Sequence, residues 1–325
     1  MKRIAILDDY KDVARRAADW ESLPETEVTV FTEHIADEDV LADVLAPFEV
    51  LVIMRERTAF PKSLLDRLPN LGLLVTTGMR NLSVDMAAAR DNGVVVCGTQ
   101  MMRHVPFELA WALIMAITKK IPAEDRSMHE GGWHHAVGIG LKGKTLGILG
   151  LGSLGTEVAK IGIAFDMSVI AWSENLTAER AADVGVTRVE KDELFAQSDV
   201  LSIHLLLSER TTGIVGAQEL AKMKPTAYLI NTARGGLVDT GAVVGALQEN
   251  RLGGVGLDVF PVEPLPAVDP LVLGLNHGAA WARGRVVLTP HVGGVSPQAL
   301  EELRRRSVET ARDYLVDGIL NNRIA

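Results

Sequence analysis

The chain has 325 residues, 47% of them hydrophobic and 23% charged, and this length favours two domains over one. The formal net charge of -9 and the lack of a long lysine or arginine run argue against nucleic acid and anionic membranes as partners. One cysteine, Cys97, excludes a disulfide framework, and because it closes the apolar run GVVVC we expect a buried thiol and a reducing, cytoplasmic compartment.

The first predicted sheet occupies the first hundred residues. Short runs rich in valine, isoleucine and leucine alternate there with longer segments of helical period, which is typical of parallel strands joined by helical crossovers. The start, MKRIAIL, has too short an apolar run for a signal peptide. These residues predict a doubly wound, flavodoxin-like unit with strands at 3–7, 27–31, 50–54, 71–77 and 93–97.

Next comes FELAWALIMAI (107–117), too short to cross a bilayer and therefore expected to be a core helix. The sequence then predicts a second sheet, with strands at 144–149, 167–172, 186–189, 199–205, 227–231, 254–259 and 285–290. The final segment, 297–320, reads as one amphipathic helix without a strand after it, so we expect it to pack back on the first unit. The prediction is an α/β protein of two doubly wound parallel-sheet domains with a cleft between them.

A glycine motif opens the second series. In GILGLGSLGTEVAK, Gly150, Gly152 and Gly155 form GxGxxG directly after a predicted strand and directly before a predicted helix. The first glycine permits a tight turn, the second lets the backbone approach a pyrophosphate, and the third lets helix and strand pack closely. We therefore expect residues 104–291 to form a Rossmann dinucleotide-binding domain, and residues 1–103 plus 292–325 to form the substrate domain.

The end of the next strand bears on the choice of cofactor. An acid that bonds the adenosine ribose is usual there, but the strand ends at Trp172 and Ser173 stands in the acid's position, followed by Glu174. Serine removes a carboxylate that would repel a 2′-phosphate, yet the nearest arginine is Arg180 and a phosphate would meet Glu174 first. We expect NAD, with Ser173 or Glu174 on the ribose hydroxyls, and keep NADP as the alternative.

Three later strands end in residues suited to hydride chemistry on a carbonyl. Arg234 follows AYLIN, Glu263 follows GLDV, and His291 follows RVVL, all at carboxyl ends of parallel strands, where such sheets bind ligands. An arginine holds a carboxylate by paired hydrogen bonds, and a histidine donates a proton near neutral pH. A glutamate bonded to the far ring nitrogen would orient that histidine. Taken singly, Arg234 also fits a surface ion pair, Glu263 a solvated loop acid, and His291 a buried histidine whose hydrogen bonds are satisfied within the protein.

The motifs GLGSLG, LINTARGGLVD, GLDVFPVEPLP and VVLTPHVGG, in this order, resemble the D-isomer-specific 2-hydroxyacid dehydrogenases. The resemblance covers nearly the whole chain. It implies an NAD(P)-dependent oxidoreductase of 2-oxo acids and D-2-hydroxy acids, acting as a homodimer. It also implies that Arg234 binds the substrate carboxylate and carbonyl, that His291 is the general acid/base, and that Glu263 is its partner.

The same resemblance implies the remaining contacts. Ala233 and Asp258 are expected to hold the nicotinamide carboxamide, and the backbone of Gly78 and Met79 the substrate carboxylate. The full set of expected cofactor contacts is Gly150, Gly152, Ser153, Leu154, Gly155, Ser173, Glu174, Thr232, Ala233, Asp258 and Gly293. The chain departs from the family where a glycine, an aromatic residue and Asp-Asn are usual, and carries instead Arg80, Asn81, Leu82 and Ser83.

The segment IMRERTAF supplies two more cations, Arg55 and Arg57, which would share one face if the chain were extended. With Arg80 they would form a second cationic patch for an additional anionic or polar group on the substrate, because RERT resembles part of the phosphate-contacting segment in some phosphoglycerate dehydrogenases. The expected substrate is of the hydroxypyruvate or glyoxylate type or of the phosphoglycerate type. The alternative is surface arginines paired with Glu56. Phosphoglycerate dehydrogenases often carry a C-terminal regulatory domain, and this chain stops at Ala325, which weakens that interpretation.

Three further features leave alternatives open. Residues 270–284 form an unusually long link, which is either a solvated loop or a cover in which Trp281 or His277 lies over the cleft. His134 and His135 lack a third ligand, so no metal site is expected. Corepressors resembling this family bind peptides with the same fold, so an NAD(H)-sensing interaction protein is the rival interpretation. Formate dehydrogenases have glutamine in place of Glu263, which argues against them.

Overall fold

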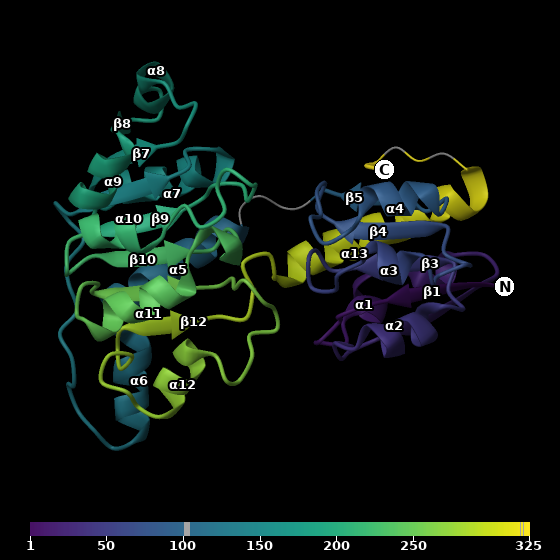
Figure 1. The fold of residues 1–325 in the computed structure, drawn as a ribbon, viewed down its shortest axis with the longest axis horizontal. Coiled ribbons are helices and arrows are strands. Elements are labelled where there is room, and N and C mark those ends of the chain that lie inside the picture. The colour runs from purple at the N-terminus through teal and green to yellow at the C-terminus, as the bar shows by residue number, and fades with distance from the viewer. Residues whose placement is uncertain (101–104, 319, 321) are drawn as a thin grey trace. The chain divides into compact units, whose positions relative to one another are not determined.

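The computed structural model describes residues 1–100, 105–318, 320 and 322–325, and it shows two compact α/β units (Figure 1). Unit 1 comprises Met1–Met102 and Val295–Ala325, and unit 2 comprises Arg103–Gly294. The expected boundary between residues 103 and 104 lies outside the described residues. None of the helices in the described part of the chain has the length and apolar character needed to cross a membrane.

Unit 1 is built on a five-stranded sheet in the order β2-β1-β3-β4-β5, and every strand pair in it is parallel. The expected flavodoxin-like fold is confirmed. Runs such as VLVI in β3 are buried at every position because helices cover both faces of the sheet. The strands are β1 (Lys2–Ile6), β2 (Thr26–Val30), β3 (Val50–Ile53), β4 (Leu73–Thr77) and β5 (Val95–Thr99).

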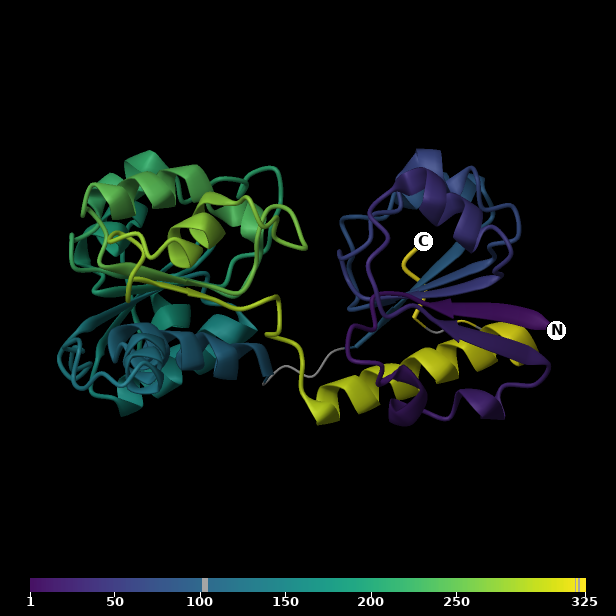
Figure 2. The same ribbon diagram turned by 90° about the horizontal axis from the view of Figure 1, so that it is seen from below.

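The helices of unit 1 form two layers around this sheet (Figure 2). Their apolar side chains divide into two buried clusters, one on each face. One layer consists of α2 (Glu38–Leu45), α3 (Lys62–Leu65) and α4 (Met86–Asp91). The other consists of α1 (Ala14–Ala17), the short 3-10 helix η1 (Trp20–Ser22) and α13 (Pro297–Arg312).

Helix α13 joins the end of the chain to its beginning. It starts at Ser296, whose hydroxyl accepts a hydrogen bond from the Ala299 N–H at 3.1 Å, and its α-helical part is shorter than expected because a π-helical turn, η3 (Asp313–Asp317), follows it. Arg304 in α13 is fully buried and pairs with buried Asp9, just beyond β1, at 3.3 Å. Such a pair is costly to break because the remaining charge would stay buried.

The C-terminal residues cover the free edge of β5. The Ile324 N–H donates to Val96 O at 2.8 Å, the Val96 N–H donates to Ala325 O at 3.0 Å, and the Gly98 N–H donates to Asn322 O at 2.9 Å. Cys97 between them is buried as expected, and burial raises the pKa of its thiol to about 11. The thiol is therefore held in its unreactive, protonated form.

Unit 2 contains a seven-stranded parallel sheet in the order β12-β11-β10-β9-β6-β7-β8. Read from β8, this is the doubly wound Rossmann order, and the order reverses between β6 and β9. The expected Rossmann fold is confirmed. The strands are β6 (Thr145–Leu149), β7 (Ser168–Trp172), β8 (Thr187–Arg188), β9 (Val200–Ile203), β10 (Tyr228–Asn231), β11 (Gly254–Leu257) and β12 (Val286–Leu288).

Helices cover both faces of this sheet as well (Figure 2). One layer comprises α5 (Val105–Thr118), α7 (Ser153–Ala164) and α8 (Ala178–Ala182). The other comprises α9 (Lys191–Gln197), α10 (Ala217–Lys222), α11 (Thr240–Gln248) and α12 (Pro270–Asn276). Two further helices are α6 (Ile121–His129) and the 3-10 turn η2 (Gly235–Leu237).

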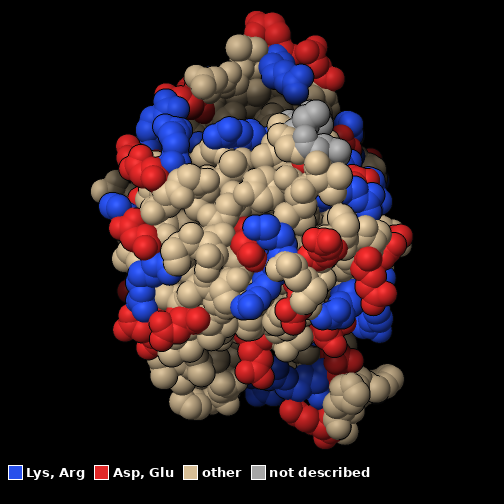
Figure 3. All heavy atoms as spheres, turned by 90° about the vertical axis from the view of Figure 1, so that its right-hand side faces the viewer, with Lys and Arg blue, Asp and Glu red and all other residues tan. Residues whose placement is uncertain are grey.

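Charged side chains of both signs are interspersed on the face in Figure 3, around a broad area without charge. Exposed cations of unit 1 pair with nearby acids, as Arg67 does with Asp39 at 2.6 Å and Arg305 with Glu302 at 2.8 Å. Such pairs each contribute little to stability. On this face the charges form a mixed surface and not a patch of one sign.

Candidate active site

The glycine motif of unit 2 forms a tight turn between β6 and α7. Gly150 has a φ of 104°, and a Cβ on it would lie 2.8 Å from the backbone carbon of His204, which follows β9. A Cβ on Gly155 would lie 2.2 Å from Gly150 O. Both positions therefore exclude any larger side chain. The turn lies where the strand order reverses, which is the usual ligand position in such a sheet.

Gly152 differs from these two glycines, because the surrounding residues leave room for a side chain at its position. No atom of the described residues lies within 4 Å of where its Cβ would be. Gly152 is the N-cap residue of α7, where the described chain offers no side-chain cap and the first turn holds no acid. The first turn of the helix, which includes Ser153 and Leu154, therefore presents unpaired N–H groups to open space. This cradle fits a dinucleotide pyrophosphate.

The end of β7 carries the two residues that bear on the ribose. Ser173 is partly exposed, and its carbonyl accepts the Leu176 N–H at 3.0 Å in a turn, while Glu174 is exposed. Arg180 is the nearest arginine along the sequence, and the structure adds Arg188, which pairs in register with Ala171 near the end of β7. Its guanidinium donates to Leu176 O at 2.9 Å and to Glu190 at 2.7 Å. Arg188 is thus already engaged by an acid.

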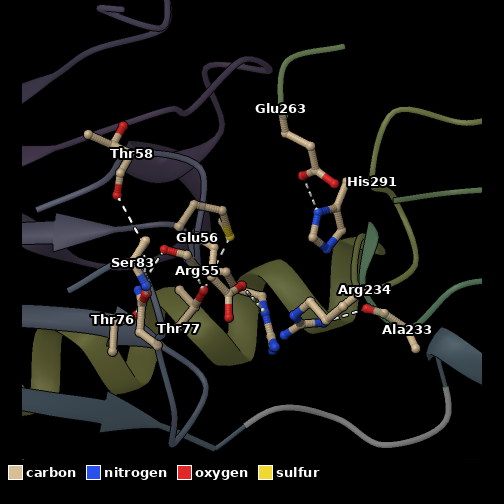
Figure 4. A network of polar contacts seen from close by, with 12 residues as sticks. Arg55, Glu56, Thr58, Thr76, Thr77, Ser83, Ala233, Arg234, Glu263 and His291 are labelled. Atoms are coloured by element: carbon tan, nitrogen blue, oxygen red, sulfur yellow. Dashed lines mark hydrogen bonds and ion pairs between the residues drawn. The ribbon is translucent and has the colours of Figure 1, made fainter. Parts of the chain in front are cut away.

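Beyond β10, Asn231 organises the segment that contains Thr232, Ala233 and Arg234. The buried Asn231 amide accepts the Ala233 N–H at 3.0 Å and donates to Arg234 O at 2.9 Å. The Arg234 guanidinium donates to Ala233 O at 2.7 Å (Figure 4). Because this amide fixes both backbone groups, the partly buried arginine extends from a rigid turn.

Glu263 and His291 are in direct contact. His291 Nδ1 lies 2.5 Å from Glu263 Oε2, and both side chains are about one-fifth exposed (Figure 4). The other Glu263 oxygen accepts the Phe260 N–H at 2.9 Å, which fixes the carboxylate. Since a carboxylate accepts, Nδ1 carries the hydrogen of this bond. Among the described residues His291 Nε2 has no hydrogen-bond partner, so it is available to a substrate.

Asp258, after β11, determines how the His291 segment is held. His291 has a φ of 50°, unusual for a residue with a side chain, and its N–H donates to Asp258 O at 2.8 Å. The fully buried Asp258 carboxylate accepts from the Thr289 hydroxyl at 2.6 Å and from the N–H groups of Val292 and Gly293, each at 2.8 Å. Burial raises the pKa of Asp258, against the effect of these hydrogen bonds.

Asp258 was expected from the family resemblance to contact the nicotinamide carboxamide, and that remains a prediction. Its hydrogen bonds to the His291 segment were not expected, because they join residues from two strands. The register places Leu257 of β11 beside Leu288 of β12 and beside Asn231 of β10. The residues that follow these strands, Arg234 and His291 among them, therefore lie at neighbouring strand ends of unit 2.

His204 lies at the end of β9, beside the glycine turn. Its Nε2 is 2.8 Å from the hydroxyl of buried Ser202. Burial lowers the pKa of His204 to about 4, so the ring is neutral at physiological pH. A neutral ring beside the glycine turn is suited to the wall of a cofactor site and not to proton transfer.

In unit 1, Gly78 and Met79 follow β4. Gly78 has a φ of 93° and donates to Thr99 O at 2.9 Å. A Cβ on Gly98 would lie 2.6 Å from Gly78 O, so Gly98 lets the loop pack closely on β5. Met79 and Arg80 are exposed, and within the described chain their N–H groups have no acceptor. Such a turn with free N–H groups is suited to a carboxylate.

The expectation of one face for Arg55 and Arg57 is wrong, because residues 54–58 form a turn and not an extended strand. Arg55 has a φ of 48°, and its guanidinium lies 3.5 Å from Glu56 (Figure 4). The Arg57 guanidinium donates to Asp8 O at 3.0 Å and stacks over the Tyr10 ring at 4.8 Å. Arg57 is thus held at the end of β1 by its own neighbours.

Residues 270–284 are not a solvated loop. They contain α12, in which Leu271 is fully buried in the core of unit 2. A Cβ on Gly274 would lie 2.3 Å from the Trp281 ring, so the tryptophan packs on this helix. His277 is the exposed C-cap residue of α12. Asp269 and Pro270 provide the sequence signal for this helix, an N-cap acid followed by proline.

Comparison with known proteins agrees with this geometry. A family model described as the NAD binding domain of D-isomer specific 2-hydroxyacid dehydrogenases matches residues 111–293. The glyoxylate reductase of Aeropyrum pernix is 36% identical over 290 residues, which cover 83% of this chain and 82% of that protein. The D-3-phosphoglycerate dehydrogenase of Archaeoglobus fulgidus is 33% identical over 290 residues, covering 88% of this chain but 53% of that protein, so the chain spans about half of its length.

Among solved structures, a phosphoglycerate oxidoreductase from Vibrio cholerae has a TM-score of 0.88 and 36% identity, with 97% of this chain and 99% of that chain covered. The agreement therefore extends over both units and not over the glycine motif alone. The chain belongs to the D-isomer-specific 2-hydroxyacid dehydrogenases and is an NAD-dependent oxidoreductase.

Proposed function

We propose that His291 is the general acid/base of this dehydrogenase, that Glu263 orients it, and that Arg234 binds the substrate carboxylate. The observation that carries the proposal is the 2.5 Å contact between His291 Nδ1 and Glu263 Oε2. This contact leaves Nε2 available to the substrate. The position of Arg234 also supports the proposal, because an arginine on a rigid turn at a neighbouring strand end supplies the cation that a 2-oxo acid needs.

When bound, NADH would supply the hydride needed to reduce the carbonyl. His291 gives the proton on Nε2 to the carbonyl oxygen, so that the product is a neutral alcohol beside its carboxylate. The Glu263 carboxylate stabilises the protonated ring before transfer and fixes its orientation. Arg234 holds the carboxylate and polarises the carbonyl through charge-assisted hydrogen bonds. Oxidation reverses these steps, and His291 then accepts the proton.

The residues that would hold NAD come from five strand ends of unit 2, those of β6, β7, β10, β11 and β12. Gly150, Gly152, Ser153, Leu154 and Gly155 would bind the pyrophosphate through the α7 N-terminus. We propose that Ser173 or Glu174 bonds the adenosine ribose. A preference for NAD over NADP is supported by the pairing of Arg188 with Glu190, which neutralises a cation near the end of β7. Thr232, Ala233, Asp258 and Gly293 would border the nicotinamide.

The proposed substrate is a short 2-oxo acid or D-2-hydroxy acid, of the glyoxylate or hydroxypyruvate type or of the phosphoglycerate type. Relatives with these names support the choice. Gly78 and Met79 would bind the carboxylate, and Arg55 and Arg80 would contact an additional anionic or polar group. Arg57 was predicted to belong to this set, but its contacts with Asp8 and Tyr10 make it a weaker candidate.

A substrate panel tests the reaction. NADH and NADPH oxidation is measured with glyoxylate, hydroxypyruvate, pyruvate, phenylpyruvate and phosphohydroxypyruvate. His291→Gln or Arg234→Ala should lower kcat by about 100-fold or more, since each removes a group acting in the transition state, while NADH still binds. His129→Gln, an exposed histidine on α6, is the matched control and should keep its activity. Turnover near that of the unaltered enzyme in His291→Gln would refute the assignment.

We also propose a homodimer and a cytoplasmic location. Trp133 is 82% exposed and Val137 is 83% exposed in the segment that follows α6. Apolar side chains this exposed favour an interface with a second copy. The cytoplasmic location is supported by the one cysteine, which is buried and unpaired.

A further inference from the structure

Arg55 has a backbone conformation that is unfavourable for its residue type. Its φ of 48° lies in the left-handed region, which costs an arginine about 1–2 kcal/mol and a glycine almost nothing. A long cationic side chain is therefore present at a position where glycine or asparagine would be more stable. Strained positions of this kind are often held by surrounding structure at functional sites.

The loop after β4 holds this conformation. The Arg55 N–H donates to the Thr77 hydroxyl at 2.9 Å, and Arg55 O accepts from Asn81 Nδ2 at 2.7 Å. Both backbone polar groups of Arg55 are thus bonded to side chains of one neighbouring segment. Because β3 and β4 are adjacent, these bonds tie together the two loops that follow them (Figure 4).

Asn81 is itself fixed in place. It is 3% exposed, and its Nδ2 also donates to the Thr76 hydroxyl at 2.8 Å. Its Oδ1 accepts from the Ser83 N–H at 2.9 Å and from the Ser83 hydroxyl at 2.7 Å. Both amide hydrogens and the amide oxygen are used, so the side chain has one orientation. This residue lies in the stretch where the sequence departs from the family pattern.

We propose that Asn81 is a positioning residue that holds Arg55 in its left-handed conformation and so aims the Arg55 guanidinium at the distal group of the substrate. This inference rests on the proposed function, since it needs Arg55 to contact the substrate. It assigns the departure around Asn81 a role in substrate selection. The reacting groups of unit 2 take no part in this contact. The loss of Asn81 or Arg55 should therefore change KM and not kcat.

Double-mutant kinetics with phosphohydroxypyruvate test the proposal. Arg55→Ala should raise KM by about tenfold or more, as expected for a lost hydrogen bond to a charged group. Asn81→Leu should produce most of that increase, with kcat within about twofold and KM for NADH unchanged. The Arg55→Ala/Asn81→Leu double variant should be no worse than Arg55→Ala, because Asn81 then has nothing to aim.

Two outcomes would overturn the inference. If the KM increases of Asn81→Leu and Arg55→Ala multiply in the double variant, Asn81 acts independently of Arg55. If Arg55→Ala leaves KM unchanged, the proposed substrate contact fails, and the inference fails with it. The first outcome leaves the proposed contact of Arg55 with the substrate intact, and the second removes it, while neither changes the roles proposed for His291 and Arg234.

A second variant covers the case in which Asn81→Leu does not fold. Thr77→Val removes the other bond to Arg55 with almost no change in volume. It should raise KM and lose that effect in the Arg55→Ala background, while KM increases that multiply in the double variant would again contradict the proposal. Asn70→Leu is the matched control, because Asn70 bonds Ala46 O on the surface of unit 1 and its loss should leave KM unchanged. Circular dichroism confirms the fold of each variant.

Discussion

The pair of Glu263 and His291 shows how much depends on single atoms. The carboxylate occupies Nδ1, the Phe260 N–H holds the carboxylate, and the Asp258 carbonyl holds the His291 backbone. The loops after β11 and β12 therefore determine together the direction of one imidazole. A change in either loop should alter catalysis without touching the substrate.

Replacing Glu263 with glutamine should move the pH profile of reduction. Glutamine keeps the shape and an acceptor oxygen but loses the charge that favours the protonated ring. Since protonated His291 is the acid in reduction, the optimum should move to lower pH. The measurement is kcat/KM for reduction across pH 5 to 9. An unchanged profile would show that the carboxylate does not act on the ring.

His204 should make stability depend on pH. Its pKa is about 4 in the folded chain and 6.5 in the unfolded chain, so the unfolded chain binds the proton first as pH falls. The contribution of neutral His204 to the free energy of unfolding is complete above pH 6.5 and is lost progressively as the pH falls to 4. The loss is at most about 3 kcal/mol, and less because part of the ring is exposed.

Guanidinium unfolding at pH 7.0 and 4.5 measures this loss. His204→Gln should reduce the difference between the two pH values, since glutamine does not titrate. His129→Gln, which removes an exposed histidine, should leave the difference as it is. Equal differences in all three proteins would contradict the assignment to His204.

Among the elements, the turn between β6 and α7 is the least tolerant of change. Gly155→Ala puts a Cβ 2.2 Å from Gly150 O, so strand and helix must separate. We expect NADH affinity to fall about tenfold or more, because the α7 N–H groups move from the pyrophosphate. Fluorescence titration with NADH measures it. Gly245→Ala on α11 is the matched control, because no atom of the described chain lies within 4 Å of its Cβ.

The control should be stabilised by about 0.5–1 kcal/mol, as expected for alanine in a helix interior, with its NADH affinity unchanged. If Gly155→Ala and Gly245→Ala bound NADH equally well, close packing at Gly155 would have no bearing on the cofactor.

The strands could be predicted from sequence because their signal is local. Buried runs such as VLVI and YLIN are apolar on both faces, and each predicted strand is present with small differences at its ends. The contact of Glu263 with His291 was also predicted, because each follows a recognisable strand within a family motif. The family and the doubly wound fold of both units were also predicted from the sequence. The comparisons confirm the family, and the strand orders confirm the fold.

What could not be predicted depends on partners distant in the sequence. The left-handed turn at Arg55 is held by Thr77 and Asn81, which only the sheet brings near. Arg188 lies beside Ala171, near the end of β7, because β8 pairs with β7. Such hydrogen bonds leave no periodic pattern. The helix α12, in contrast, was missed although its N-cap aspartate and proline were visible.

For the whole molecule, the exposed segment after α6 predicts the state of association. Trp133→Ala combined with Val137→Asp should lower the mass measured by light scattering from dimer to monomer, because the apolar contact is lost and a charge is added. Val268→Asp, at an equally exposed valine of unit 2, is the control and should remain dimeric. A monomer before any substitution would contradict the proposed dimer.

The return of α13 to unit 1 also sets the order in which the chain can fold during synthesis. Unit 2 is continuous and is fully translated at Gly294, whereas unit 1 must wait for α13 and for Arg304, the partner of Asp9. Nascent chains usually complete the N-terminal domain first. Here the later unit can finish first, and for most of translation one face of the first sheet is covered only by the short helices α1 and η1. A ribosome-associated chaperone that shields this face would therefore act on residues near the N-terminus until the last helix emerges.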